Sequence, residues 1–331
     1  MRKCSLRLLK YYAALVVAMS SIPVAAQIPS TDSLLGAGLG VDHVGLVVRD
    51  LEQVQRDYEG LGFKVSVGGS FPGGLSNKII HFGNETYLEL LSVKDPKTSS
   101  GEMADFVSFA SKHDGAMFLG LQVSSAKETA TFLKTRDFDM TGPDPGQILK
   151  GGETEPPPPQ WYTVSPADKP AAGKQSFNIP IFFIEYLKAT RSKHAQDAAQ
   201  QPNGAMAITA AWFVVRDLQD QLKTLRAGGF EPDQSREAFL LGARGSAFRA
   251  GSGWIVLLDA ADKAKPLRKF VSDYGDGIIT ISVETSNIKK AEGFAESGAH
   301  IKPKHYSGTF GRSFLLPPIT THGLWIEMFQ R

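Results

Sequence analysis

The sequence has almost no cysteine: Cys4 is the only one among 331 residues. Residues 1–26 have the pattern of a cleaved signal peptide, with basic residues first, an apolar stretch over Tyr12–Val24 and small residues before Gln27. Cleavage near Ala26 would also remove Cys4. The expected mature chain then has no thiol, which excludes disulfides, cysteine catalysis and thiolate-bound metal.

The alternative interpretation of residues 1–26 is a membrane anchor. The apolar stretch contains Ser20, Ser21 and Pro23, and it is shorter than the roughly 20 residues that a transmembrane helix needs. We therefore expect an exported protein, periplasmic or secreted, that is free of the membrane once the signal peptide is cleaved.

The chain also has little excess charge of either sign. It has 36 Lys and Arg against 34 Asp and Glu, a net charge of +2. The predicted signal peptide carries four of the basic residues and no acidic one, which leaves the mature chain at −2. Such a balance does not favour nucleic acid or an anionic membrane as partner.

Two common catalytic motifs are missing from the sequence. No glycine-rich phosphate loop precedes a predicted helix with the required spacing. No Gly-x-Ser-x-Gly nucleophile elbow occurs either. The sequence therefore offers neither a nucleotide-phosphate cradle nor a serine-hydrolase nucleophile.

The feature that organises the chain is an internal repeat. Val47–Leu51 reads VVRDL and recurs unchanged as Val214–Leu218, and a Gly-Phe pair follows both copies at the same offset, Gly62-Phe63 and Gly229-Phe230. A chain that repeats itself in this way is built from copies of one supersecondary unit.

The first copy predicts a β-α-β-β-β unit. Asp50 is a plausible helix N-cap and Gly62 a plausible end of the same helix. Apolar and β-branched residues predict the strands. The four predicted strands are Val44–Val48, Phe63–Val67, Lys78–Phe82 and Tyr87–Val93.

Three later segments fit the same template. The fold class that we predict is α+β, with four βαβββ units paired into two half-barrel domains. The predicted domains are residues 40–187 and 205–331, joined by a linker over 188–204. Pro156–Pro159 predicts an extended polyproline loop inside the first domain, with a recognition motif for a partner domain as the alternative.

Two polar residues of the first unit point to chemistry. His43 is at the head of the first strand and Glu89 lies in the middle of the last, between leucines. A carboxylate in so apolar a strand is costly unless it is paired or bound to a metal. Imidazole and carboxylate together suit a hard or borderline divalent cation. The alternatives are a hydrogen-bonded histidine and an ion pair between Glu89 and Lys78.

Four stretches resemble the vicinal-oxygen-chelate superfamily, in particular its glyoxalase-like branch: residues 42–51, 61–63, 82–91 and 180–186. The resemblance is good over 41–187 and looser over 205–330. It implies paired βαβββ units that form a half-barrel around a divalent metal. In that superfamily the metal binds two neighbouring oxygens of the substrate.

Residue by residue, the resemblance implies His43, Glu89 and Glu185 as metal ligands, with either glutamate as acid or base. The fourth ligand position carries Phe118, or Met117 one residue earlier. The third unit has Ala210 and Val256 at the matching places, and the fourth has Ile278 and the less favoured ligand Glu327. Asn77, His81 and Trp161 are candidate substrate-binding residues. The metal could be Zn, Mn, Ni, Fe or Mg.

One histidine with two carboxylates favours a metal-dependent lyase or isomerase that acts on a small molecule with vicinal oxygens. The lack of a second histidine disfavours an extradiol-type dioxygenase. A protein of this fold that binds a small molecule without turnover is the alternative. A weaker option is that the third and fourth units serve only as a lid. We expect His305 and His322 on the surface and Lys263–Lys269 on a solvated face, and leave open whether the protein is a homodimer.

Overall fold

The computed structural model describes residue 35 and residues 39–71, 74–93, 102–148, 158–190 and 200–331. The predicted signal peptide, residues 191–199 of the predicted linker and the first two prolines of Pro156–Pro159 lie outside the described residues. No helix in the described ranges is both long enough and apolar enough to cross a membrane.

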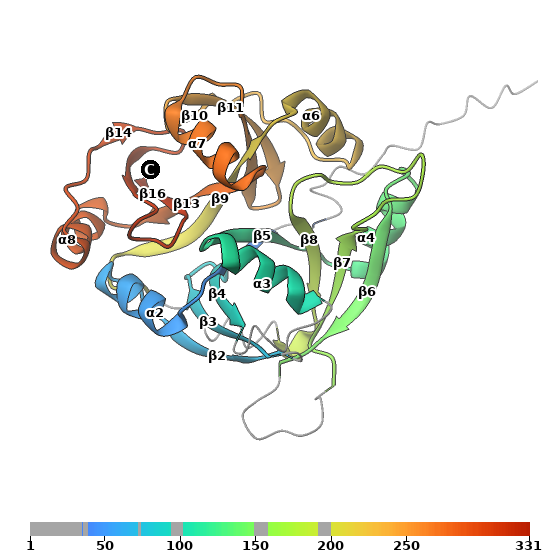
Figure 1. The fold of residues 1–331 in the computed structure, drawn as a ribbon, viewed down its shortest axis with the longest axis horizontal. Helices are drawn as coiled ribbons and strands as arrows, with labels where there is room; N and C mark the ends of the chain where they lie inside the picture. Colours follow the sequence, from blue (N-terminus) through green and yellow to red (C-terminus); the bar gives the residue numbers. More distant parts are fainter. Residues whose placement is uncertain (1–34, 36–38, 72–73, 94–101, 149–157, 191–199) are drawn as a thin grey trace, which may run out of the picture.

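The first half of the chain contains two copies of the βαβββ unit (Figure 1). An additional helix, α3, joins the two copies. The elements are β1 (Gly40–Val47), α2 (Leu51–Gly60), β2 (Ser66–Ser70), β3 (Leu75–His81), β4 (Tyr87–Val93), α3 (Glu102–Lys112), β5 (Gly115–Gln122), α4 (Ala126–Lys134), β6 (Met140–Gly146), β7 (Trp161–Pro166) and β8 (Ile181–Tyr186).

The second half repeats this order, and α7 takes the place of α3. Its elements are β9 (Ala205–Val215), α6 (Leu218–Ala227), β10 (Ala238–Leu240), β11 (Ala243–Ala250), β12 (Gly253–Asp259), α7 (Lys265–Tyr274), β13 (Gly277–Thr285), α8 (Ile288–Ala299), β14 (Tyr306–Ser307), β15 (Arg312–Leu316) and β16 (Trp325–Gln330). The interpretation of Lys263–Lys269 as a solvated face was wrong in part, because Leu267 of α7 is fully buried.

Each half forms one eight-stranded sheet, in the orders β2-β3-β4-β1-β5-β8-β7-β6 and β10-β11-β12-β9-β13-β16-β15-β14. Within each unit the first strand pairs parallel with the last, and the two first strands of a sheet pair antiparallel. The first unit therefore pairs with the second and the third with the fourth.

Local sequence signals position the helices. The side chain of Asp50 accepts hydrogen bonds from the backbone N–H groups of Glu52 and Gln53, which fixes the start of α2. Asp217 does the same at the start of α6 through the backbone N–H of Asp220. The repeated Arg-Asp-Leu thus marks the turn from the first strand into the helix in both halves.

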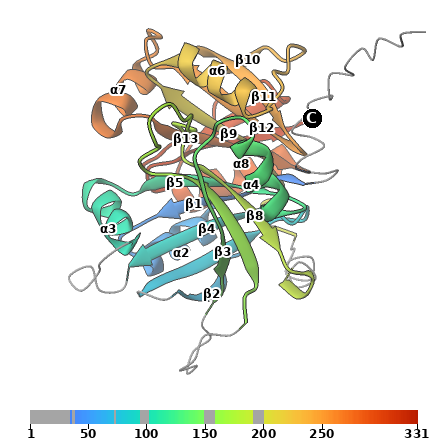
Figure 2. The same cartoon turned by 90° about the vertical axis from the view of Figure 1, so that its right-hand side faces the viewer.

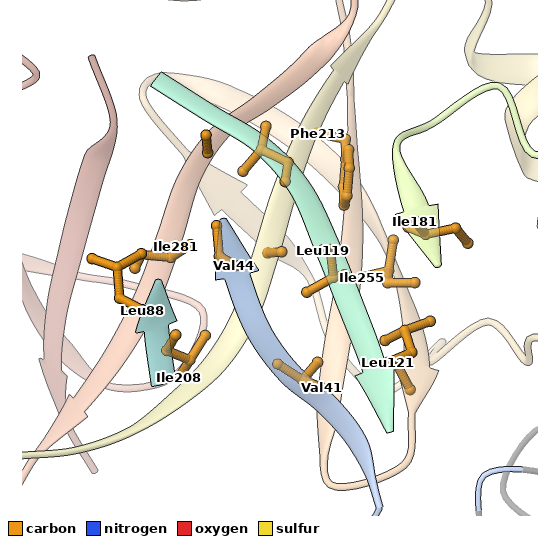
Figure 3. Packing of buried hydrophobic residues seen from close by; sticks show 14 of the residues in the cluster. Val41, Val44, Leu88, Leu119, Leu121, Ile181, Ile208, Phe213, Ile255 and Ile281 are labelled. Atoms are coloured by element: carbon orange, nitrogen blue, oxygen red, sulfur yellow. The ribbon is translucent and has the colours of Figure 1, made fainter. Parts of the chain in front are cut away.

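The main core lies between the two sheets, which are stacked on one another (Figure 2). Side chains alternate along a strand, so Val44 and Leu46 of β1 and Leu119 and Leu121 of β5 point to this core. Figure 3 shows Val44 and Leu119 of the first half beside Phe213 and Ile281 of the second. Because this interface uses one face of each sheet, the other face of each is left to be filled or to stay hollow.

In the second half that other face is filled by large side chains. Trp212, Trp254, Phe310 and Phe329 pack together there with Leu267 of α7. Trp212 is fully buried, and its indole N–H donates to Ser282. Aromatic side chains of this size occupy the space where a half-barrel would otherwise hold a ligand.

One histidine of the second half joins it to the first. The Nε2 of His322 lies 2.9 Å from Asp57 on α2, and its Nδ1 lies 3.2 Å from Asp114, just before β5. Asp114 also pairs with Arg49 at 2.8 Å. The expectation of an ordinary surface histidine was therefore wrong, because His322 is half-buried between two carboxylates.

We expect the contribution of His322 to stability to decrease as the pH rises. Partial burial lowers the pKa of His322, but hydrogen bonds and charge from Asp114 and Asp57 outweigh it, and the pKa is raised. A raised pKa stabilises the fold below the pKa of the unfolded chain, and this gain is lost as the pH rises through the folded-state value. Because His322 is partly exposed, the gain in the free energy of unfolding is limited to about 1 kcal/mol.

The measurement is urea unfolding of the wild type and His322→Asn at pH 5.5 and 8.5, values that bracket the ordinary histidine pKa. Asn tolerates the left-handed backbone at this position, where φ is 55°. The stability difference should be larger at the lower pH. A difference that is equal at both values, or larger at pH 8.5, would contradict the assignment.

Candidate functional site

The open face of the first sheet holds a cavity of about 490 Å³. Residues of β1, β3, β4, β5, β6, β7 and β8 line it, and so do Met103 and Phe106 of α3. All of the residues that line it lie between His43 and Tyr186. The option that the third and fourth units form a lid over the site was therefore wrong, since they pack on the opposite face.

The most distinctive group of the cavity is a histidine held by its neighbour in sequence. The Nδ1 of His43 lies 2.6 Å from Oδ2 of Asp42, and both side chains are almost fully buried. Consecutive residues of a strand normally point to opposite faces. Here the register with β5 shifts between Val41 and His43, which is a β-bulge. The bulge lets Asp42 reach the ring of His43 while Val41 and Val44 both point to the core.

Two tyrosines complete the environment of Asp42. The hydroxyl of Tyr186 donates to Oδ2 of Asp42 at 2.8 Å, and the Tyr87 and Tyr186 hydroxyls lie 2.8 Å apart. Burial raises the pKa of both tyrosines well above the usual value, so each keeps its proton. The ring of Tyr87 stacks on His43 with a centroid distance of 4.5 Å. The imidazole is therefore fixed at its Nδ1 and on one face.

Glu89 faces the other nitrogen of the imidazole. Its Oε2 lies 3.7 Å from Nε2 of His43, and its Oε1 accepts a hydrogen bond of 2.6 Å from the Asn77 amide. Burial raises the pKa of Glu89, and His43 and Asn77 offset this only in part. The alternative ion pair with Lys78 was wrong, because Lys78 bonds instead to Glu52 and Gln55 of α2.

The sheet register shows what stands at the symmetry-related positions of the second unit. His43 pairs with Gly120 and Gly45 pairs with Phe118, so Phe118 is the counterpart of His43 across the β1–β5 pair. Glu89 is opposite Gly45 in β4, and Phe182 is opposite Gly120 in β8. Phe182 is therefore the counterpart of Glu89. Both phenylalanine rings pack edge-on against His43.

The prediction that Glu185 joins His43 and Glu89 was wrong. Phe182, Ile184 and Tyr186 of β8 line the cavity, so the alternation of the strand turns Glu185 to the other face. There Oε2 of Glu185 accepts a hydrogen bond of 2.7 Å from the backbone N–H of Ala126, the first residue of α4. The carboxylate satisfies a free N–H at a helix start, a structural role.

Of the three predicted substrate-binding residues, two line the cavity and one does not. Asn77 and Trp161 line the cavity, and Asn77 also accepts from the backbone N–H of Gly69 at 2.7 Å. Trp161 packs edge-on against Phe71. His81 lies outside the lining of the cavity, at the end of β3, with its ring 5.8 Å from that of Tyr87.

Glu327 of β16 is opposite Ser282 of β13, so it has in the fourth unit the position that Phe182 has in the second unit and Glu89 in the first. It is fully buried and bonded to the hydroxyls of Ser282 and Tyr306, at 2.5 and 2.8 Å. The register places Thr280, not the predicted Ile278, at the counterpart of His43. Glu327 therefore takes no part in the cavity of the first half.

Several residues that shape the site escaped the sequence reasoning. A Cβ atom at Gly120 would lie 2.5 Å from Cε1 of His43, and one at Gly45 would lie 2.2 Å from the ring of Phe118. The two glycines thus make room for the two rings. The acidic neighbour Asp42 was visible in the sequence, but strict alternation would have turned it away from His43. Only the bulge brings the two together.

The comparisons with known proteins agree with this architecture. The model of the Glyoxalase-like domain family matches residues 41–226, more than half of the chain. No curated protein matches the chain. A solved hypothetical protein from Staphylococcus aureus superposes with a TM-score of 0.59 at 13% identity, over 88% of this chain and 99% of that one.

Two further solved structures share the fold. A mutant of 4-hydroxymandelate synthase from Streptomyces coelicolor has a TM-score of 0.55 at 13% identity, with 88% of this chain and 93% of that chain covered. A xylose isomerase-like TIM barrel/4-hydroxyphenylpyruvate dioxygenase fusion protein has a TM-score of 0.56 at 13% identity, over 92% of this chain but 49% of that one. Identities this low show the fold alone. With its tandem paired units and the match over residues 41–226, the chain belongs to the glyoxalase-like family of the vicinal-oxygen-chelate fold.

Proposed function

We propose that the protein is an enzyme of the lyase or isomerase kind that moves a proton on a small molecule with adjacent oxygens. The observation that carries the proposal is the buried pair of Asp42 and His43, joined at 2.6 Å at the base of an open cavity. A carboxylate that orients a histidine, whose other nitrogen faces the substrate space, is a common arrangement for a general base.

The contact with Asp42 indicates which ring nitrogen of a neutral His43 carries the hydrogen. Oδ2 of Asp42 accepts the hydrogen bond from Tyr186, so the carboxylate is an acceptor toward Nδ1 as well. The Nδ1 of His43 therefore carries the hydrogen, and Nε2 presents its lone pair to the cavity. When Nε2 takes a proton from a substrate, the negative charge of Asp42 stabilises the imidazolium that forms.

Glu89 supplies the acid that such a reaction needs in addition to a base. Burial raises the pKa of Glu89, so its carboxyl takes up a proton more readily than an exposed glutamate and can pass it to a substrate oxygen as negative charge develops there. The hydrogen bond from Asn77 fixes its orientation. A base and an acid on one wall of the cavity are what a proton transfer from carbon, followed by return, requires.

The residues do not fit the four-ligand metal centre that the resemblance implied. Of the four equivalent positions, His43 and Glu89 carry donor atoms, whereas Phe118 and Phe182 carry none. In the described part of the chain, no group of three or more His, Cys, Asp or Glu residues is placed to hold a metal. Catalytic zinc generally has three protein ligands. We therefore propose acid–base chemistry by the side chains themselves.

Metal content tests this directly. We expect purified protein to contain divalent metal well below one equivalent, and treatment with EDTA to change its activity by less than about twofold. Elemental analysis of the wild type and His43→Ala is the measurement. One equivalent of metal in the wild type that is lost in His43→Ala would restore the metal-dependent mechanism and overturn the proposal.

The function itself is tested by exchange of a carbon-bound proton. Phenacyl alcohol carries a carbonyl, an adjacent hydroxyl and acidic C–H groups between them. Incubation in D₂O with the protein should reduce the ¹H NMR signal of the CH₂ group of phenacyl alcohol, because deuterium replaces its hydrogens. Incubation with His43→Gln should leave this signal unchanged. Glu185→Gln, outside the cavity, is the matched control. Exchange that is equally fast with His43→Gln would exclude His43 as the base.

A binding protein without turnover remains the second candidate. The observation in its favour is the aromatic lining of the cavity, which by itself suffices to hold a ligand. Ligand binding together with no exchange of any carbonyl probe would favour it.

Export of the mature chain also stays a proposal, and an intact Met1 on the protein isolated from its cells would contradict it.

A further inference from the structure

The cavity contains a hydrogen-bond acceptor that faces no protein donor. Within the described ranges no hydrogen bond reaches Nε2 of His43, and the nearest charged atom, Oε2 of Glu89, is 3.7 Å away. That separation is too long for a hydrogen bond. Nε2 opens on the cavity and is not one of the sealed polar atoms that lack a partner among the described residues, so a ligand that brings a donor to this point can take the place of solvent there.

The walls around this acceptor are aromatic. The rings of Phe71, Phe106, Phe118, Phe182 and Trp161 all line the cavity. Phe118 packs edge-on against both Phe106 and Phe182, which leaves a rigid apolar chamber next to Nε2. Such walls favour a planar ring, which gains both apolar burial and stacking or edge contacts. A cavity of about 490 Å³ has room for one or two fused rings with a small substituent.

The described lining of the cavity has few groups that could pair with an anion. No Lys or Arg occurs among the described residues that line the cavity, and its ionisable groups besides tyrosine are His43 and Glu89. The carboxylate of Asp42 lies directly behind His43. Lys78, the base nearest in sequence to this wall, is turned away and held by Glu52. A ligand carboxylate or phosphate would lose its hydration here and approach the carboxylate of Asp42 without a lysine or arginine to compensate.

We infer that the cavity takes an uncharged or cationic aromatic compound that donates a hydroxyl or amino hydrogen to Nε2 of His43, and that it rejects aromatic carboxylates. The inference rests on the site of the proposed function and adds the class of its substrate. The ring lies among the aromatic side chains, and the donor group reaches the base that is to act on the neighbouring carbon.

The experiment compares four probes with the same ring: naphthylmethanol, naphthylmethylamine, naphthylmethyl methyl ether and naphthoate. Isothermal titration calorimetry gives the dissociation constant of each. We expect the alcohol and the amine to bind about tenfold or more tighter than naphthoate, and several-fold tighter than the ether, which lacks the donor. Naphthoate that binds as tightly as the alcohol would overturn the charge selection. An ether that binds as tightly as the alcohol would overturn the role of Nε2.

Variants separate the parts of the inference. His43→Phe should remove the difference between alcohol and ether while both still bind. Trp161→Leu, at the edge of the cavity, should weaken all four probes together and does not disturb the Asp42 pair. Glu185→Gln should change none of them. If His43→Phe does not fold, the order of the four probes on the wild type still decides the question.

The binding measurements test the ligand class whether or not the protein turns over a substrate. Tight binding of the alcohol without exchange of phenacyl alcohol would remove the proposed proton transfer but leave the ligand class in place. Exchange together with preferred binding of naphthoate would do the opposite.

Discussion

Replacing Asp42 by Asn is expected to lower kcat for the exchange of phenacyl alcohol by about 10²- to 10⁴-fold. The amide has nearly the same shape, so the cavity and the contact with Tyr186 should be kept. It carries no charge to stabilise an imidazolium, and its NH₂ group can turn toward Nδ1 of His43. The imidazole proton would then move to Nε2, where the lone pair is needed.

The pattern of the effect distinguishes this role from a structural one. KM should change much less than kcat, because Asp42 lies behind His43 and does not line the cavity. Initial rates by NMR over a range of substrate concentrations give both constants. Glu185→Gln again serves as the control carboxylate. A kcat within a factor of about three of the wild type would exclude Asp42 as the orienting group of the base.

The second large effect is expected from Gly120→Ala. The new Cβ atom would lie 2.5 Å from Cε1 and 2.7 Å from Nδ1 of His43, so the ring must move or the two strands must separate. Either response breaks the contact with Asp42. Displacement of a catalytic group by about 1 Å can reduce the rate about 10²-fold. The strain should also lower the free energy of unfolding by about 1–3 kcal/mol.

Exchange rates and urea unfolding measure the two consequences of Gly120→Ala. Gly293→Ala on α8 is the matched control, because a Cβ atom there meets nothing within 4 Å and alanine favours the helix. That variant should keep full activity and equal or higher stability. Full activity of Gly120→Ala would show that the position of His43 relative to Asp42 is not important for function.

The two glycines beside His43 explain why part of the site could not be predicted. A glycine in a strand indicates a bulge or a close approach, but not what approaches it. Gly120 and His43 are far apart in the sequence and meet only through the antiparallel pairing of β1 and β5. That pairing depends on how two units associate, which no local pattern contains.

The error at Glu185 has a similar origin. Glu185 lies in strand β8, but the expectation that its side chain faces the cavity was wrong. A strand that shares one face with the core and the other with a cavity has apolar residues on both, so alternation gives no clear signal. The register to β5 made Phe182 the counterpart of Glu89 and assigned Glu185 to the start of α4.

By itself, the sequence determined the repeated βαβββ unit and its helix caps, because these follow from local periodicity and from an exact repeat. The family resemblance, and not periodicity, suggested that His43 and Glu89 share one site. The tertiary structure alone decided that Asp42 serves His43, that two phenylalanines replace the remaining ligand positions, and that the second half-barrel is filled. Those facts depend on a bulge, on strand register and on side-chain volume across units, which arise only when distant segments pack together.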